Sequence, residues 1–303
     1  MEDFDLQWDK LTIKASNELQ APIENILLDL DAQGIEKDDT EFLSNQDKQI
    51  NISGFFELQQ EISNKLDLIK KKLLELEKYG FNTQGIELVS QIIDDETWKN
   101  EWEKYYHVQR ITNFLTIVPF WEEYRKTKDS EIVINLDPQQ AFGTGTHPTT
   151  ILTLQALESH LRGNERVFDV GTGTGVLSIA ASLLGAKEIY ACDIEDDSLI
   201  SAKRNLELNK KVTNVELELS SLLDKAKGKA DLILANVLPE VQAMLLPQVE
   251  AHLNNNGMII MSGIILEKEA AMRSLIKENG LEIMETLSDG KWIAITAKKT
   301  QEG

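Results

Sequence analysis

The sequence predicts an α/β fold, in which a larger domain with an open, mostly parallel sheet follows a smaller α+β domain. Strand and helix patterns alternate from residue 145 onward, which is typical of a sheet covered by helices on both faces. The first 94 residues show a different order of elements. A glycine-rich turn joins the first strand of the larger domain to the helix after it. The 303 residues suffice for two such domains.

The N-terminal region, residues 1–94, is predicted to be a unit with the order strand, helix, strand, strand, helix, strand. Apolar residues at steps of three and four indicate helices over 17–30 and 57–79, which we expect Gly34 and Gly80 to end. This order fits a split βαβ sandwich. The composition does not distinguish a general packing domain from a substrate-recognition domain. The β-prone runs are residues 6–13, 50–56 and 85–93.

Residues 95–130 are predicted to connect the two domains. A helix is expected to begin near Asp94, because acidic residues are favoured in the first turn. Trp98 and Trp102 lie four residues apart and are expected to pack against each other. Two β-prone stretches follow, at 110–119 and 131–136. The predicted boundaries are therefore an N-terminal domain at 1–94, a linker at 95–130 and a larger domain at 131–303.

Seven strand signals follow the linker, and helical stretches are predicted between the first six. The last two signals are separated by residues 286–291, which contain the hairpin signal Asp289-Gly290. The final strand is therefore expected to run antiparallel to its neighbour. The seven signals are residues 166–170, 188–192, 215–219, 231–235, 258–262, 281–285 and 292–297.

The composition excludes several classes of function. A formal net charge of −20 repels nucleic-acid phosphates and suits a basic protein partner. The one cysteine, Cys192, lies in an apolar run and is predicted to be a buried core thiol, and the four histidines show no metal-ligand spacing. The acidic N-terminus does not resemble a signal peptide, and no apolar run approaches the roughly 20 residues of a membrane helix. We therefore expect a cytoplasmic protein with no metal site and no membrane or direct nucleic-acid contact.

The main chemical signal is the glycine-rich turn Asp169-Val170-Gly171-Thr172-Gly173-Thr174-Gly175. It lies at the carboxyl end of a predicted strand, where ligands bind in open α/β sheets. Glycines there let a ligand approach the main chain closely. The spacing G-x-G-x-G does not fit a dinucleotide fingerprint, because residue 176 is valine, and no lysine completes a phosphate loop. The turn predicts a nucleoside-type cofactor; the alternative is a tight turn without a ligand.

Polar residues follow two other strands at the same edge. Asp193, 18 residues past Gly175, is placed to accept hydrogen bonds from both ribose hydroxyls, and this narrows the cofactor towards S-adenosylmethionine. It could also cap the helix that begins near Glu195. Asn236 follows the fourth strand, and its carboxamide oxygen could accept a hydrogen bond from a substrate amine and aim the nitrogen lone pair at a methyl group. The alternative for Asn236 is an N-cap.

The segment Ala141-Phe142-Gly143-Thr144-Gly145-Thr146-His147-Pro148-Thr149-Thr150 precedes the first strand of the larger domain. Pro148 lies near the first turn of a predicted helix. Backbone N–H groups and hydroxyls at a helix N-terminus suit a carboxylate. His147 is predicted to have a structural or capping role rather than to act as a base.

Taken together, these motifs resemble those of the bacterial methyltransferases that modify ribosomal protein L11. The run 141–150 looks like the signature loop of that family, and 169–175, Asp193 and 236–238 follow in the family's order and spacing. The resemblance is strong from about residue 94 onward and weak before it. Segments that resemble the family's linker are Trp98, Trp102, Tyr105-Tyr106 and 117–121.

The resemblance implies a two-domain enzyme: a ferredoxin-like N-terminal domain that grips the substrate, and a seven-stranded, Rossmann-like methyltransferase domain. It implies transfer of methyl groups from S-adenosylmethionine to lysine side chains and the N-terminal amine of ribosomal protein L11. Asn236 would orient the amine. We expect a cytoplasmic monomer. The cofactor contacts that the resemblance implies are Thr150, Gly171, Gly173, Asp193, Asn236 and Phe142.

The sequence departs from the family pattern at a few places. Pro138-Gln139-Gln140 stands where the family usually has Pro-Gly-Met, and Thr172 and Thr174 stand where it has Cys and Ser. The N-terminal domain is longer, and residues 31–35 match the family's glycine-containing turn only loosely. Two alternatives therefore stay open: a methyltransferase for another protein lysine or a small amine, and a catalytically silent nucleoside-binding scaffold.

Overall fold

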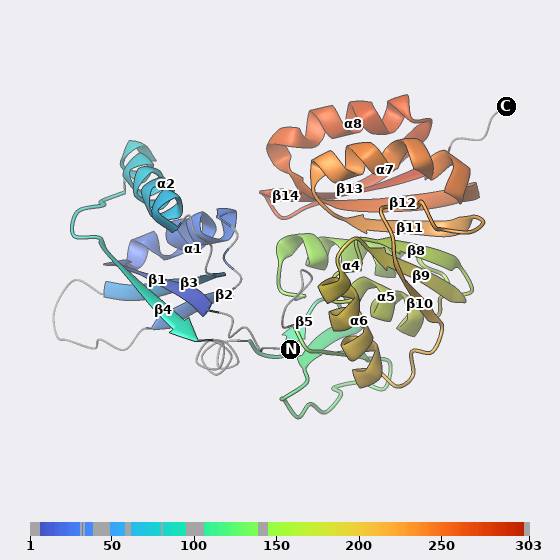
Figure 1. The fold of residues 1–303 in the computed structure, drawn as a ribbon, viewed down its shortest axis with the longest axis horizontal. Helices are drawn as coiled ribbons and strands as arrows, with labels where there is room; N and C mark the ends of the chain where they lie inside the picture. Colours follow the sequence, from blue (N-terminus) through green and yellow to red (C-terminus); the bar gives the residue numbers. More distant parts are fainter. Residues whose placement is uncertain are drawn as a thin grey trace. The chain divides into compact units, whose positions relative to one another are not determined.

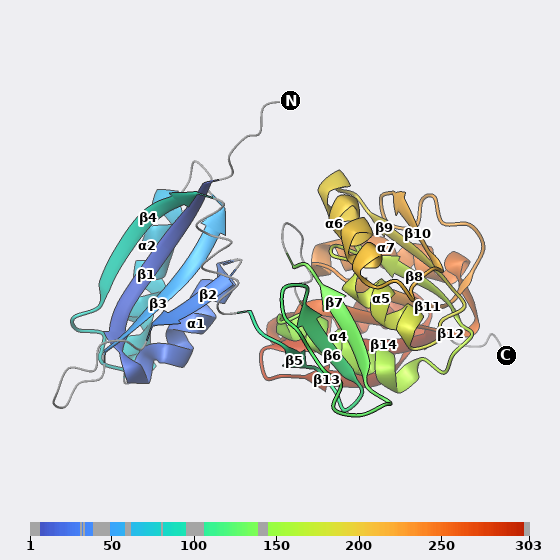
Figure 2. The same ribbon diagram turned by 90° about the horizontal axis from the view of Figure 1, so that it is seen from below.

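The computed structural model describes residues 7–30, 32, 34–38, 49–57, 62–79, 81–94, 106–138 and 145–299. The chain divides into two compact units, Met1–His107 and Val108–Gly303. Figures 1 and 2 show the elements of each unit. Within the described residues, no helix combines the length and the apolar composition needed to cross a membrane.

The first unit contains a four-stranded antiparallel sheet in the order β2-β3-β1-β4. Its apolar core lies between the sheet and two helices, because alternate residues of β1 and β3 face α1 and α2. The chain order β1-α1-β2-β3-α2-β4 and this strand order agree with the predicted ferredoxin-like arrangement. The elements are β1 (Gln7–Ser16), η1 (Asn17–Leu19), α1 (Gln20–Asp29), β2 (Gly34–Asp38), β3 (Gln49–Glu57), α2 (Ile62–Glu75), η2 (Leu76–Tyr79) and β4 (Glu87–Asp94).

The predicted role of Gly34 as a helix cap is wrong, since Gly34 is the first residue of β2. Helix α1 already ends at Asp29, where the amides of Leu30 and Ala32 both donate to the Leu27 carbonyl. These bonds satisfy the end of the helix before the chain reaches Gly34. Gly80, the other predicted cap, lies outside the described residues.

The second unit contains a seven-stranded sheet in the order β10-β9-β8-β11-β12-β14-β13. Strands β8 to β12 are parallel, so their carboxyl ends lie at one edge. Strand β14 is antiparallel to both neighbours, which confirms the predicted final hairpin. The strands are β8 (Arg166–Val170), β9 (Glu188–Asp193), β10 (Val215–Leu219), β11 (Ala230–Asn236), β12 (Leu253–Ile265), β13 (Leu281–Ser288) and β14 (Trp292–Lys299).

Helices cover both faces of this sheet, as Figure 1 shows. One apolar core includes side chains of α4 and α5, and a second core on the other face includes side chains of α7 and α8. The central strands are therefore buried on both sides, which explains their nearly continuous apolar sequences. The helices are α4 (Pro148–His160), α5 (Val176–Leu183), α6 (Asp196–Leu208), α7 (Pro239–His252) and α8 (Glu269–Glu278), with the short η3 (Leu266–Lys268) before α8.

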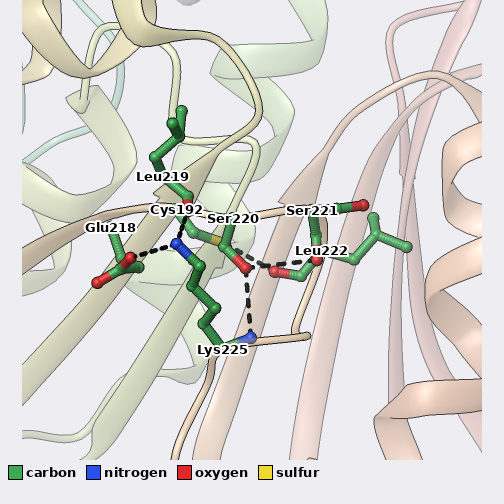
Figure 3. Close-up of polar contacts among 7 residues, drawn as sticks. All are labelled: Cys192, Glu218, Leu219, Ser220, Ser221, Leu222 and Lys225. Atoms are coloured by element: carbon green, nitrogen blue, oxygen red, sulfur yellow. Dashed lines mark hydrogen bonds and ion pairs between the residues drawn. The ribbon is translucent and has the colours of Figure 1, made fainter.

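The helix predicted between β10 and β11 is absent, because residues 220–229 form turns. Leu222 and Gly228 have positive φ values of 47° and 76°, which interrupt a helix. Figure 3 shows the polar contacts that hold this segment: the Lys225 ammonium donates to the Glu218 carboxylate at 2.8 Å and to the Leu219 carbonyl at 2.7 Å. Sequence periodicity over so short a segment did not reveal this competing arrangement.

A three-stranded sheet in the order β5-β6-β7 precedes α4 in the second unit. Its strands are β5 (Gln109–Arg110), β6 (Leu115–Pro119) and β7 (Ile132–Leu136). Strands β6 and β7 lie in the two stretches predicted to be β-prone, and β5 begins one residue before the first of them. Residues 108–130 of the predicted linker belong to the compact second unit, and residues 95–105 lie outside the described residues. The predicted boundaries of the linker therefore stay predictions. Trp98, Trp102 and the helix expected to begin near Asp94 fall in or next to that undescribed segment.

Candidate active site

The predicted site residues come together at the carboxyl edge of the seven-stranded sheet. The glycine loop follows β8, Asp193 ends β9, and Asn236 ends β11. These three strands are neighbours in the order β9-β8-β11. The chain continues from β8 towards β9 on one side and from β11 towards β12 on the other, so this is the topological switch point at which such sheets bind ligands.

The glycine loop has a backbone that only glycine adopts without strain. Gly171, Gly173 and Gly175 have φ values of 72°, 52° and 79°. A Cβ atom on Gly171 would lie 2.4 Å from Val237 Cγ1, and one on Gly175 would lie 3.2 Å from Ala202 Cβ. The loop is therefore packed between the turn after β11 and helix α6, and its glycines are needed for both conformation and space.

Three consecutive residues of this loop are bound by three different elements. The Thr172 hydroxyl donates to Asp169 Oδ2 of β8 at 2.7 Å, and the Gly173 amide donates to Asp193 Oδ2 of β9 at 2.9 Å. The Thr174 carbonyl accepts from Asn205 Nδ2 of α6 at 2.9 Å. These contacts fix a segment that would otherwise be flexible because of its glycines.

Asp169 is a fully buried carboxylate, which the sequence analysis did not single out as a site residue. It also accepts from the Ser178 hydroxyl at 2.6 Å, while its Oδ1 has no hydrogen-bond partner within the described part of the chain. Burial raises the pKa of Asp169 to about 6, although the hydroxyls of Ser178 and Thr172 act in the opposite direction. An acidic residue inside the apolar strand Arg166–Val170 was the signal that could have identified it.

Asp193 joins the glycine loop to the start of α6. Its Oδ1 accepts from the Glu195 amide at 3.2 Å, and Glu195 is the N-cap residue of α6. A carboxylate has about four lone-pair positions, and two of them are used by these amides. Asp193 is therefore not the N-cap of α6, the sequence alternative for it, because that position is Glu195, and its carboxylate can still accept from a ligand diol.

Asn236 and Thr150 are 86 residues apart in the sequence, and the fold brings them together. Asn236 Nδ2 donates to the Thr150 hydroxyl at 3.3 Å, which orients the carboxamide. Asn236 Oδ1 is buried and has no hydrogen-bond partner among the residues that the structure describes. Asn236 is not the N-cap of α7, since that position is Leu238. A buried acceptor without a donor is unusual, and it indicates a place for a ligand N–H.

The turn that carries Asn236 is clamped by Gln242 of α7, a fully buried residue that the sequence analysis missed. Gln242 Nε2 donates to the Val237 carbonyl at 2.9 Å and also to the Ser262 carbonyl of β12. At Gly263, where φ is 87°, a Cβ atom would lie 2.4 Å from the Val237 carbonyl oxygen. The turn is thus fixed between α7 and the end of β12.

His147 is the N-cap of α4, the capping role predicted for it. Its Nδ1 accepts from the Thr149 amide at 3.3 Å, and its ring packs edge-on against the Trp292 ring with centroids 5.1 Å apart.

Cys192 is fully buried, as predicted, and burial raises the pKa of its thiol to about 12. Phe142 lies outside the described residues.

Comparisons with known proteins identify relatives over almost the whole chain. The family model described as Ribosomal protein L11 methyltransferase (PrmA) matches residues 7–300. Relatives named ribosomal protein L11 methyltransferase include one from Streptococcus thermophilus (strain CNRZ 1066), 39% identical over 98% of this chain and 97% of the relative. Another, from Enterococcus faecalis, is 35% identical over 98% of this chain and 100% of the relative.

A solved structure is also similar. The crystal structure of a ribosomal protein L11 methylase from Lactobacillus delbrueckii subsp. bulgaricus matches with a TM-score of 0.61 and 39% identity. The match covers 64% of this chain and 100% of that chain.

Proposed function

The chain belongs to the ribosomal protein L11 methyltransferase family, and from this premise we propose that it transfers methyl groups from S-adenosylmethionine to lysine side chains and the N-terminal amine of ribosomal protein L11. The family match spans residues 7–300, so it includes both units. The net charge of −20 suits a basic substrate. We further propose that the protein is a cytoplasmic monomer, that its first unit grips the substrate and that it makes no direct contact with nucleic acid.

The residues at the carboxyl edge fit S-adenosylmethionine. Asp193 retains acceptor positions for ribose hydroxyls, and Gly171, Gly173 and Gly175 leave the main chain of the loop without a side chain at three positions. When bound, the cofactor supplies an electrophilic methyl group on a sulfonium. The proposed contacts are Thr150, Gly171, Gly173, Asp193, Asn236 and Phe142.

The observation that carries the proposal is the buried, unpartnered Oδ1 of Asn236. With its Nδ2 bound to Thr150, the carboxamide presents this oxygen to accept an N–H from a neutral substrate amine. That bond would hold the amine with its lone pair free for an in-line attack. Such positioning can supply roughly 7–11 kcal/mol of a reaction barrier. A lysine amine must first lose a proton, since its ordinary pKa is about 10.4, and desolvation in the site would lower that pKa.

The substrate is tested with radiolabelled S-adenosylmethionine and ribosomal proteins from a strain that lacks this methylation. We expect label on ribosomal protein L11, with mass spectrometry locating it on lysine side chains and the N-terminal amine. Label on another protein would overturn the substrate assignment. Failure of the chain to bind S-adenosylmethionine in calorimetry would support the silent-scaffold alternative.

The role of Asn236 is tested with Asn236→Ala, which should lower turnover by about a hundredfold or more, a larger change than in cofactor affinity. Asn254→Ala is the matched control, because the Asn254 amide binds Asp231 at the start of the strands rather than at their carboxyl ends. Near-normal turnover of Asn236→Ala would exclude the orienting role.

A further inference from the structure

Asn205 of helix α6 and Asn209, the C-cap residue of that helix, cover the outer edge of strand β7. Within the described residues, β7 pairs with β6 and is the edge strand of its sheet. On its other side, Asn209 accepts from the Asn135 amide at 3.0 Å and donates to the Asn135 carbonyl at 2.7 Å. Asn205 does the same for Asp137, accepting from its amide at 2.6 Å and donating to its carbonyl at 3.0 Å.

The spacing explains why two side chains can act as a neighbouring strand. Residues four apart on a helix are separated by about 6 Å along its axis. Residues two apart on a strand are separated by about 6.6 Å. Asn205 and Asn209 therefore match Asp137 and Asn135, and each carboxamide exchanges a pair of hydrogen bonds with the main chain. An edge strand with its polar groups satisfied in this way is well fixed in position.

The two asparagines differ in their remaining hydrogen bond. Asn209 Nδ2 also donates to the Asn205 carbonyl at 2.8 Å, within its own helix. Asn205 Nδ2 also donates to the Thr174 carbonyl at 2.9 Å, in the glycine loop. Asn205 thus joins three segments, since it belongs to α6 and binds both the end of β7 and the loop.

The bond to Thr174 acts at the centre of the glycine loop. Thr174 lies between Gly173 and Gly175, whose backbones are held at positive φ. One turn before Asn205 on the same helix, Ala202 packs against Gly175. Asn205 is fully buried, so its three hydrogen bonds form away from water, where losing one leaves a costly unpaired group.

We propose that Asn205 is a positioning residue for the cofactor, which acts by fixing the Thr174 carbonyl to the end of β7. The hydrogen bonds of Asn205 fix the loop backbone before the cofactor binds. The fixed backbone includes the Gly173 amide, which donates to Asp193. Binding then requires less ordering of the loop, and affinity is higher. The inference rests on the proposed binding of S-adenosylmethionine.

The test compares Asn205→Asp with Asn209→Asp. Each change removes two donated hydrogen bonds to main-chain carbonyls, one of which goes to Asn135 of β7 or to Asp137 directly after it. We expect both variants to melt at a lower temperature. Only Asn205→Asp should weaken S-adenosylmethionine binding in calorimetry, by about tenfold or more. The uncharged pair Asn205→Leu and Asn209→Leu should show the same contrast. Equal affinity losses in both members of a pair, at temperatures where both are folded, would overturn the inference.

Amide hydrogen exchange tests the loop without relying on cofactor binding. In Asn205→Leu the Gly173 amide should exchange faster than in Asn209→Leu, and equal rates would contradict the inference. If the Asn205 variants do not fold, amide exchange in the unmodified protein still tests the role of Asn205. Added S-adenosylmethionine should slow exchange of the Asp137 amide, which binds Asn205, more than that of the Asn135 amide, which binds Asn209. Equal slowing of the two amides would contradict the positioning role of Asn205. Failure of the unmodified protein to bind the cofactor would overturn the proposed function, and the Gly173 comparison would then still decide whether Asn205 fixes the loop.

Discussion

The glycine loop after β8 and the turn at residues 236–239 after β11 lie side by side at one sheet edge, but they are held in different ways. The loop is bound by two carboxylates and an asparagine from three elements. The turn is bound by neutral groups, Gln242 and Thr150. The loop thus depends on ionisable groups, whereas the turn does not. Disturbing it should change cofactor affinity first, whereas disturbing the turn should change turnover first.

The largest expected effect comes from Gly263→Ala, which would displace the turn. The new side chain combines a left-handed backbone with a 2.4 Å approach to the Val237 carbonyl oxygen. We expect a loss of about 3 kcal/mol in the free energy of unfolding, measured with urea, and a larger fall in turnover than in cofactor affinity. Gly290→Ala is the control, because Gly290 also has a positive φ but no atom within 4 Å of the added Cβ. Equal losses in the two variants would show that the contact with Val237 does not matter.

Asp169→Asn tests the carboxyl group that supports the loop through its pH dependence. The folded carboxyl has a pKa of about 6, above its unfolded value, so folding takes up a proton between about pH 4 and pH 6. The stability from this group is present at low pH and is lost as the pH rises through that window, by up to about 3 kcal/mol. Urea unfolding from pH 4 to 7 should show this loss in the unmodified protein relative to Asp169→Asn. Parallel stability curves would exclude it.

Gln242→Leu tests the neutral clamp on the turn. It leaves the carbonyls of Val237 and Ser262 without their donor, at a cost of about 2 kcal/mol in stability. Turnover should fall by about tenfold or more while the dissociation constant of S-adenosylmethionine changes little. Gln248→Leu on the same helix is the control, because its side chain binds the Leu223 amide instead. A larger change in affinity than in turnover for Gln242→Leu would remove the distinction between loop and turn.

Thr150→Val is expected to have the smallest effect. It removes the hydroxyl that orients Asn236, at about 1 kcal/mol, which corresponds to about a fivefold fall in turnover. Thr153→Val on the same helix loses only a bond to the Thr149 carbonyl and should leave turnover unchanged. Identical kinetics of the two variants would mean that the Thr150 hydroxyl does not orient Asn236.

Much of the fold could be predicted because burial imposes simple periodicities on the sequence. The seven strand signals each fall within an observed strand, and Asp289-Gly290 marked the hairpin. The positions of the glycine loop, Asp193 and Asn236 followed from the rule that parallel strands end at one edge. The absent helix at 220–229 and the start of β2 at Gly34 were not predictable in this way, since tertiary contacts decide them.

The supporting residues of the site could not be predicted from local patterns. Asn205 binds main-chain carbonyls 68 and 31 residues away, and any residue type can supply a carbonyl. Gln242 likewise binds the carbonyls of Val237 and Ser262. Because their partners have no side-chain signature, such residues become visible only when the fold brings the segments together.

The buried thiol of Cys192 gives the protein a built-in reporter of local opening. Cys192 directly precedes Asp193, the residue proposed to bind the ribose. Its thiol donates to the Leu222 carbonyl at 3.0 Å. It is the single cysteine of the sequence, so a thiol reagent modifies the chain at one place. Reagent and sulfur can meet only when the edge around β9 and β10 opens, because the thiol is fully buried. The rate of labelling therefore measures how often the cofactor edge of the sheet opens, in the protein as it stands.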